Sequence, residues 1–429
     1  MRRQAALLVA VSLFAWTGIS LGNSIFSFHS SGLGLVAPAG DARSLGMGYA
    51  TVSVYDDDNI TSRNPATLTA VNRASFTGTF VSQRRDVEDN IAANGTATYY
   101  EQNPRIIRLV VPVAYGIRVA AGLEPLTDQH LVWSALQSEA GIAFRDSLET
   151  NGGLWCGTLE AARAFGDFSA GVKMRVVRGD MTTEWRRTVA SLEIDSTVYL
   201  NPLATSVLRS RHFSGLAFSL GATWRPDPEW TVGAVLDIKS SLDEQRIVSV
   251  GTRIPSFFYP SHYSDGASSV MVVSDMNDTA DVSTSYPWGL GLGATWRPAE
   301  RLVTTAEIYY QRWSQIHSSF DDSWRISTGI EFVPVESYRS LFFLRWPYRL
   351  GFRWEKHYIP SPNEGPTAWF VTAGFGIPLG KTRKTGRIDY AFEFGKRGTI
   401  SANTAQERVW RHTISVTAWD EWFAYRPRR

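Results

Sequence analysis

The side chains that could carry out chemistry in this chain are few, and they match no catalytic or metal-binding motif. Asp56, Asp57 and Asp58 are consecutive, whereas a calcium loop places its ligands at every second residue, so a polar turn is the simpler interpretation and calcium the alternative. The seven histidines are scattered, and the motifs H-E-x-x-H, H-x-x-E-H and G-x-S-x-G do not occur. A hydrolase would need a distant Ser/His pair to meet in the fold, which sequence does not exclude. We expect no enzyme activity, no metal and no cofactor.

Cys156 is the only cysteine among the 429 residues. An intramolecular disulfide is therefore excluded, and a metal site has no second thiolate. We interpret Cys156 as a small strand residue rather than a reactive thiol. The formal net charge of +2 predicts no nucleic-acid partner.

The heptapeptide LGATWRP occurs at Leu220–Pro226 and again at Leu292–Pro298, each time before a second apolar run. Proline lacks a backbone donor and ends a strand at a turn, so each copy predicts a hairpin. Around the first copy, apolar residues alternate with small, polar or charged ones, which is the period of a strand with one apolar face. The apolar set is Leu216, Phe218, Leu220, Ala222 and Trp224.

Such alternation suits a soluble sandwich or a membrane barrel, and the start of the chain favours the barrel. Arg2 and Arg3 precede an apolar run, and Ser20-Leu21-Gly22 forms a cleavage site before Asn23. We interpret residues 1–22 as a signal peptide. An uncleaved anchor is the alternative, although the run is shorter than the roughly 20 residues that a spanning helix needs.

About fourteen segments between residues 73 and 423 alternate in this way. Their connections alternate in length, with short turns on one rim and long loops at 84–104, 125–152, 179–211 and 241–286 on the other. Sixteen Trp and 16 Tyr residues could form two interfacial girdles. This pattern predicts a transmembrane antiparallel up-and-down β-barrel. One connection fits poorly: residues 334–348 include the apolar stretch SLFFLRW on the short-turn rim.

Charged residues fall on the less apolar face of these segments, where we expect them to line the lumen. A lipid-facing Lys or Arg at mid-depth would cost about 2–4 kcal/mol, whereas lumen charges can pair or meet water. The residues concerned are Lys173, Arg175, Asp237, Lys239, Glu307, Arg353, Glu355, Asp389 and Glu393.

The region before the first strand has no sustained period of two. Its stretch from Ala42 to Ala50 (ARSLGMGYA), the acidic step at 56–58 and the turn Asn64-Pro65-Ala66 resemble the N-terminal region of the FadL family of outer-membrane barrels and their PorV-like relatives. The resemblance implies that residues 23–72 form a hatch inside a fourteen-stranded barrel, with Asn64, Pro65 and Ala66 as the hatch turn. The resemblance identifies no ligand-binding residues, because the pocket positions of the family have no recognisable match in this sequence.

The resemblance implies a bacterial outer-membrane channel for hydrophobic compounds such as long-chain fatty acids, which leave sideways through a break in the wall. The alternative is a PorV-like interaction protein that binds exported proteins. Outer-membrane lipids and the barrel-assembly machinery are further expected partners. The chain ends in a short basic extension, residues 424–429, rather than on the aromatic residue usual for assembly signals.

Pro112 is a candidate position for the lateral gate. It removes a backbone donor from the apolar run Leu109–Val113, and in hydrocarbon an unpaired neighbouring carbonyl is costly. The simpler interpretation places Pro112 at a strand end near the rim, because Ala114-Tyr115 is a short turn.

Overall fold

The computed structural model describes residues 24–38, 40–90, 95–139, 142–189, 191–194, 197–200, 204–255, 270–335, 340–361, 364–379 and 385–420. The predicted signal peptide (1–22) and C-terminal extension (424–429) lie outside these residues. Among the described residues, no helix is long and apolar enough to cross a bilayer.

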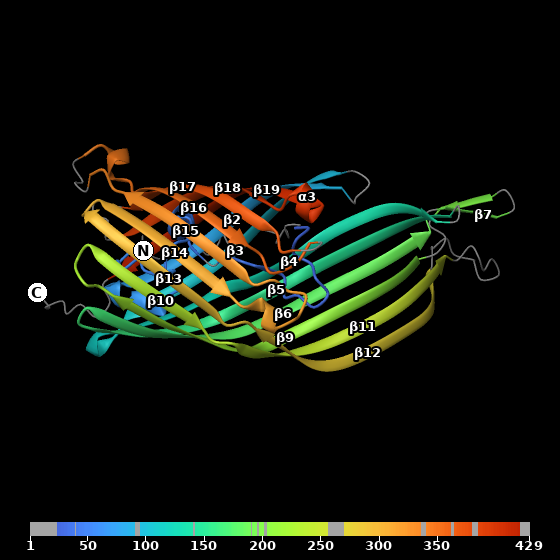
Figure 1. Ribbon diagram of the computed structural model, residues 1–429, viewed down its shortest axis with the longest axis horizontal. Helices are drawn as coiled ribbons and strands as arrows, with labels where there is room; N and C mark the ends of the chain where they lie inside the picture. The colour runs from blue at the N-terminus through green and yellow to red at the C-terminus, as the bar shows by residue number, and fades with distance from the viewer. Residues whose placement is uncertain are drawn as a thin grey trace, which may run out of the picture.

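The chain forms a closed antiparallel β-barrel of 14 wall strands, because β19 pairs with β2 (Figure 1). β10 and β11 together form one wall strand, as do β12 and β13. The wall consists of β2 (Ala74–Asp89), β3 (Thr96–Pro112), β4 (Ile117–Glu139), β5 (Ile142–Phe165), β6 (Phe168–Val189), β9 (Ala204–Trp224), β10 (Trp230–Asp237), β11 (Ser240–Pro255), β12 (Val270–Tyr286), β13 (Gly289–Ala299), β14 (Leu302–Gln311), β15 (Ser323–Phe332), β16 (Tyr348–Lys356), β17 (Thr367–Leu379), β18 (Gly386–Arg397) and β19 (Ala405–Asp420).

The other elements are short. They are β1 (Leu35–Val36), α2 (Ala42–Gly46), η1 (Pro65–Ala70), η2 (Ala114–Gly116), β7 (Ser191–Ile194), β8 (Thr197–Leu200), η5 (Trp313–Gln315), η6 (Phe342–Arg345) and α3 (Ile400–Asn403). In the described part of the chain, β7 and β8 form a separate two-stranded sheet.

The apolar faces of the strands point outward, as the alternation predicted. Leu220 is 48% exposed while its neighbour Ser219 is fully buried. The outward apolar run extends from Phe168 to Val176 on β6 and from Leu216 to Trp224 on β9. Each run is close to the ~9–11 residues that a tilted membrane strand needs.

Aromatic side chains lie near both ends of this lipid-facing belt, in agreement with the predicted girdles. On the short-turn rim, Trp230 stacks on Trp296 with ring centroids 5.9 Å apart. Near the opposite end, Trp324 and Trp354 meet edge to face at 4.6 Å.

Several predicted long loops are strands. β4, β5 and β6 have 23, 24 and 22 residues, and together with β9, β11 and β12 they project far beyond the other strands (Figure 1). Beyond the belt their outward side chains become polar, for example Arg178, Asp180 and Thr182 on β6. Period-two apolar alternation detects the part of a strand that faces lipid, so it missed the part that faces water.

Candidate functional site

Residues 24–38 and 40–72, here called the hatch segment, follow the inside of the barrel (Figure 1). Helix α2 begins after Asp41, whose carboxylate accepts hydrogen bonds from the Ser44 amide and hydroxyl. All five residues of α2 are buried, and its first amide donates to Ser415 of β19.

The predicted hatch turn caps the helix η1. The Oδ1 atom of Asn64 accepts from the Ala66 amide, and its Nδ2 atom donates to the carbonyls of Val52 and, on β9, Ala222. Pro65 is the first residue of η1, where a missing amide hydrogen costs nothing. The barrel approaches so closely here that a Cβ atom on Gly221 would lie 2.0 Å from Asn64 Oδ1. Asn64 therefore joins the hatch segment to the wall.

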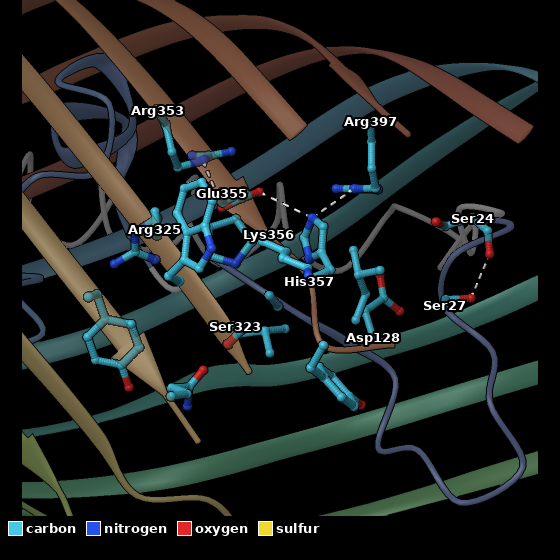
Figure 2. A pocket seen from close by; sticks show the side chains of 18 of the residues that line it. Ser24, Ser27, Asp128, Ser323, Arg325, Arg353, Glu355, Lys356, His357 and Arg397 are labelled. Carbon is cyan, nitrogen blue, oxygen red and sulfur yellow. Dashed lines mark hydrogen bonds and ion pairs between the residues drawn. The ribbon is translucent and has the colours of Figure 1, made fainter. Parts of the chain in front are cut away.

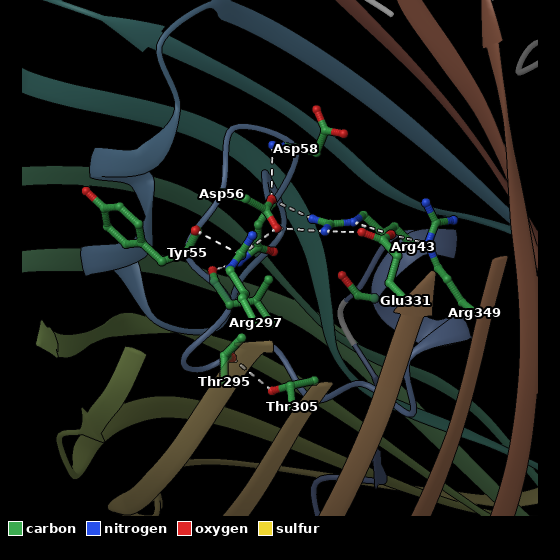
Figure 3. A network of polar contacts seen from close by, with 12 residues as sticks. Arg43, Tyr55, Asp56, Asp58, Thr295, Arg297, Thr305, Glu331 and Arg349 are labelled. Carbon is green, nitrogen blue, oxygen red and sulfur yellow. Dashed lines mark hydrogen bonds and ion pairs between the residues drawn. The ribbon is translucent and has the colours of Figure 1, made fainter. Parts of the chain in front are cut away.

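The acidic step is paired with arginines (Figure 3). Arg43 binds Asp56 with both Nη atoms at 2.8 Å and also binds Glu331 of β15. Burial raises the pKa of Asp56, but the guanidinium groups of Arg43 and Arg297 lower it more, to about 2. Asp58 pairs with Arg387 of β18 at 2.5 Å. These charged groups fasten the hatch segment to the wall on the short-turn rim.

The arginines before the final proline of the two LGATWRP copies reach the hatch segment, a role that the sequence did not reveal. The Arg225 guanidinium lies 4.1 Å from the centre of the Tyr55 ring. Arg297 donates to the Tyr55 carbonyl at 3.0 Å and to Asp56 at 3.1 Å. The repeated heptapeptide was the one sequence signal for this role, because it placed an arginine at the same position of two strands.

Most predicted lumen charges lie inside and are paired. Lys173 bridges Glu124 and Glu160 at 2.6 and 3.3 Å, and Glu307 pairs with Arg325 at 2.9 Å. The other ion pairs are Arg175 with Glu124 and Asp237, Arg353 with Glu355 and Glu393, and Asp389 with Arg349 and Arg387. The Glu307 carboxylate also accepts hydrogen bonds from the backbone amides of Thr51 and Val52 in the hatch segment.

Lys239 is the exception, because it is exposed. β10 and β11 pair with β9 in registers that differ by one residue, so an extra residue lies between Asp237 and Leu242. Such a bulge points two successive side chains, Ile238 and Lys239, away from the lumen. The prediction for Lys239 was wrong because alternation along the sequence cannot locate a bulge.

A cavity of about 60 Å³ lies beside the hatch segment (Figure 2). Its lining contains many cations and two carboxylates, Asp128 and Glu355. The cations are Arg63, Arg85, Arg105, Arg325, Arg353, Lys356, Arg397 and Arg411. A hydrophobic solute would desolvate these charges at a cost in free energy, so this part of the lumen does not suit one.

An apolar cluster lies at the barrel mouth opposite the short turns. Trp313 is fully buried and stacks on Tyr358 with ring centroids 3.6 Å apart. Leu33 of the hatch segment belongs to the same cluster, together with wall residues such as Leu154 and Leu242. The Tyr358 hydroxyl accepts from the Leu33 amide and donates to the Gly34 carbonyl. The mouth and the hatch segment are thus joined.

The wall ladder is interrupted between β3 and β4. These strands pair only from Ile107–Pro112 to Arg118–Leu123. Among the described residues, β3 from 96 to 106 pairs with β2 alone, and β4 beyond Leu123 does not pair with β3. We call this interruption the β3–β4 seam.

Pro112 lies at the other end of this ladder, opposite Arg118 and beside η2. The position predicted for a ladder defect was therefore wrong, and Pro112 is a rim residue. Proline is tolerated there because it is the last residue of β3.

The hatch segment covers part of the β4 edge at the seam. β1 pairs with β4, with Leu35 opposite Asp128 and Val36 opposite Thr127. Ala37 donates to the Leu126 carbonyl, and Ser24 donates to the His130 carbonyl. A cavity of about 380 Å³ lies above this contact between β3 and β4, and Ile25, Leu131, Val132 and Leu136 contribute to its lining.

The described residues contain no metal-site arrangement of three or more His, Cys, Asp or Glu. Cys156 is buried on β5, and its thiol lies 3.5 Å from the Glu124 carbonyl oxygen.

Solved structures of FadL-type proteins share this fold. A Pseudomonas aeruginosa FadL homologue aligns with a TM-score of 0.61 at 13% identity, covering 90% of this chain and 99% of the other. The Pseudomonas putida toluene transporter TodX aligns with a TM-score of 0.61 at 16% identity, covering 90% of this chain and 100% of the other. The CymD monoaromatic hydrocarbon channel aligns with a TM-score of 0.57 at 13% identity, covering 91% of this chain and 99% of the other. No curated protein matches the sequence. The BamG family model matches residues 1–427, and the chain therefore belongs to the BamG family.

Proposed function

We propose that this protein is an outer-membrane channel that admits hydrophobic compounds and releases them sideways through the β3–β4 seam. The observation that carries the proposal is the interrupted ladder. A wall of continuous strands offers hydrocarbon no exit, whereas unpaired strand edges inside a membrane persist only where another segment covers them. The hatch segment provides that cover along β4.

The chemistry of the interior supports a path along the seam rather than through the centre. The central lumen is filled with ion pairs, and its cavity is lined by arginines. The seam cavity has fewer charged residues in its lining, Asp89 and Arg145, and it offers Leu131, Val132 and Leu136 beside Ile25. Displacement of residues 24–37 from β4 would join this cavity to the surrounding bilayer.

We place the barrel in a bacterial outer membrane, reached through a cleaved signal peptide and with the short turns in the periplasm. Outer-membrane barrels have short periplasmic turns and longer extracellular connections, and this chain shows that asymmetry. The proposed partners are outer-membrane lipids, hydrophobic small molecules and the barrel-assembly machinery. Long-chain fatty acids and monoaromatic hydrocarbons are the first compounds to test.

A PorV-like interaction protein, which binds exported proteins, is the second candidate. One observation favours it: Arg43 joins Asp56 to Glu331, and both Asp58 and Glu307 also tie the hatch segment to the wall. Breaking buried ion pairs is costly, so these contacts favour a permanent plug.

A disulfide across β1 and β4 tests the channel. Ala37 donates to Leu126, so Val36 and Thr127 form the next, non-hydrogen-bonded pair, whose Cα atoms lie about 4.5 Å apart in antiparallel sheets. This distance suits a disulfide. In a Cys156→Ala background, oxidised Val36→Cys/Thr127→Cys should take up a fluorescent fatty acid or toluene more slowly, and reduction should restore uptake.

The matched control is Thr77→Cys/Thr417→Cys, which links strands that are already paired, with side-chain oxygens 3.0 Å apart. Its oxidation should leave uptake unchanged. No uptake by the unlocked protein, together with an exported protein retained in native mass spectrometry, would favour the interaction protein instead.

A further inference from the structure

The connection between β15 and β16 exposes three consecutive apolar side chains. Leu341, Phe342 and Phe343 are 63, 52 and 52% exposed, at the start of the short helix η6. Single exposed apolar residues are ordinary, but a contiguous group marks an interaction surface. This is the SLFFLRW stretch that the sequence placed poorly on the short-turn rim. We call Leu341–Trp346 the apolar foot.

The apolar foot is held against the outside of the barrel. The Trp346 ring stacks on Phe375 of β17, with centroids 5.2 Å apart and planes 16° from parallel. Phe375 pairs in register with Tyr348, and the Tyr348 hydroxyl donates to the Phe343 carbonyl at 2.9 Å. The connection is the orange coil that projects at the left end of the barrel in Figure 1. The apolar foot thus adjoins the lipid-facing wall at the level of the rim aromatics.

We propose that the apolar foot inserts into the periplasmic leaflet of the membrane, at the boundary between headgroups and acyl chains. Continuity with the lipid-facing belt is the main argument, because Phe375 and Tyr348 belong to that belt and support the foot directly. Aromatic side chains favour this depth. The Arg345 guanidinium lies 5.4 Å from the centre of the Phe342 ring, and a long cationic side chain beside apolar groups can reach lipid phosphates.

The test uses full-length protein in the Cys156→Ala background, reconstituted alone in phosphatidylethanolamine–phosphatidylglycerol vesicles. A nitroxide label is attached to Phe343→Cys. Its collision rate with oxygen, which concentrates in the bilayer, is compared with its collision rate with a water-soluble nickel chelate. Glu229→Cys, exposed in the β9–β10 turn on the same rim, is the matched control.

The expected result is a several-fold higher oxygen-to-nickel collision ratio at position 343 than at position 229. Adding Phe342→Ser should lower the ratio at 343, while heat-modifiable gel mobility confirms that the barrel is folded. Equal ratios at 343 and 229 would overturn the proposal and leave the apolar foot as a contact for a protein. Because no other protein is present, protection from nickel reports on lipid alone.

Discussion

Arg225 and Arg297 hold the same residue of the hatch segment, Tyr55. Each is the sixth residue of an LGATWRP copy, Arg225 directly after β9 and Arg297 on β13. The amide of each donates to a carbonyl of the preceding short turn, that of Asp167 and that of Glu229 respectively. Arg225 lies over the Tyr55 ring, and Arg297 binds its carbonyl. Equivalent places in the wall thus act on one point of the hatch segment.

We expect Arg225→Gln/Arg297→Gln to loosen the hatch segment without unfolding the barrel. The change removes a cation–π contact worth about 0.5–2 kcal/mol and charged hydrogen bonds worth about 1.5–3 kcal/mol. Faster protease cleavage within residues 40–72 and a higher conductance in planar bilayers are the readouts. Arg301→Gln is the control, because Arg301 lies on the same rim and, among the described residues, its guanidinium donates to the Pro334 carbonyl rather than to the hatch segment. If the double variant matches this control, Tyr55 is not a point of attachment.

Asn64→Ala should destabilise the hatch segment by about 2–4 kcal/mol, since a lost N-cap costs about 1 kcal/mol and each lost hydrogen bond about the same. Urea-induced exposure of a label placed in the hatch segment measures the effect. Asn72→Ala should cost less, because Asn72 is exposed, although its side chain also accepts from Arg118 of β4 and donates to the Ala70 carbonyl. Gly221→Ala should reproduce the Asn64→Ala defect from the wall side, because its Cβ would overlap Asn64. If Gly221→Ala leaves the stability of the hatch segment unchanged, Asn64 does not lie against Gly221 of the wall.

Acidification should weaken the mouth through His357, one residue beyond β16. Burial and the neighbouring Arg397 lower the pKa of His357 from 6.5 to about 3. Between these two pKa values the unfolded chain binds a proton at His357 that the folded protein does not bind. The free energy of unfolding is therefore highest above about pH 6.5 and falls as the pH decreases below it. The slope is at most about 1.4 kcal/mol per pH unit.

Thermal unfolding, followed by gel mobility at pH 7.5 and 5, should therefore show a smaller acid-induced loss for His357→Gln than for the unchanged protein. Exposed His317→Gln is the comparison. The same pH dependence in all three proteins would exclude His357 as the titrating group.

Leu220→Arg should reduce assembly in the membrane, because a mid-depth arginine facing lipid costs about 2–4 kcal/mol. Leu220 is 48% exposed on the outward face of β9. The yield of heat-modifiable barrel measures assembly, and Leu220→Met is the size-matched control. Normal assembly of Leu220→Arg would place this position away from lipid.

The sequence by itself determined the barrel and the direction of its faces. A bilayer imposes the same requirement on every strand, so the apolar alternation around Leu220 and its counterparts can be read locally. The same alternation predicted about fourteen strands, and the resemblance around Asn64 implied a hatch turn. Both inferences use only residues that are neighbours in the chain.

The tertiary structure alone decided what depends on register between distant strands. The contact of Arg225 and Arg297 with Tyr55, and the pairing of Leu35 with Asp128, join residues whose separation in the chain carries no periodic signal. Lys239 points away from the lumen because one extra residue in the strand reverses the side of every later side chain. The seam lies away from Pro112 because the point at which β3 and β4 separate depends on both strands together. Period and composition describe each strand by itself, whereas the positions of contacts, bulges and gaps arise only when the strands are packed around the hatch segment.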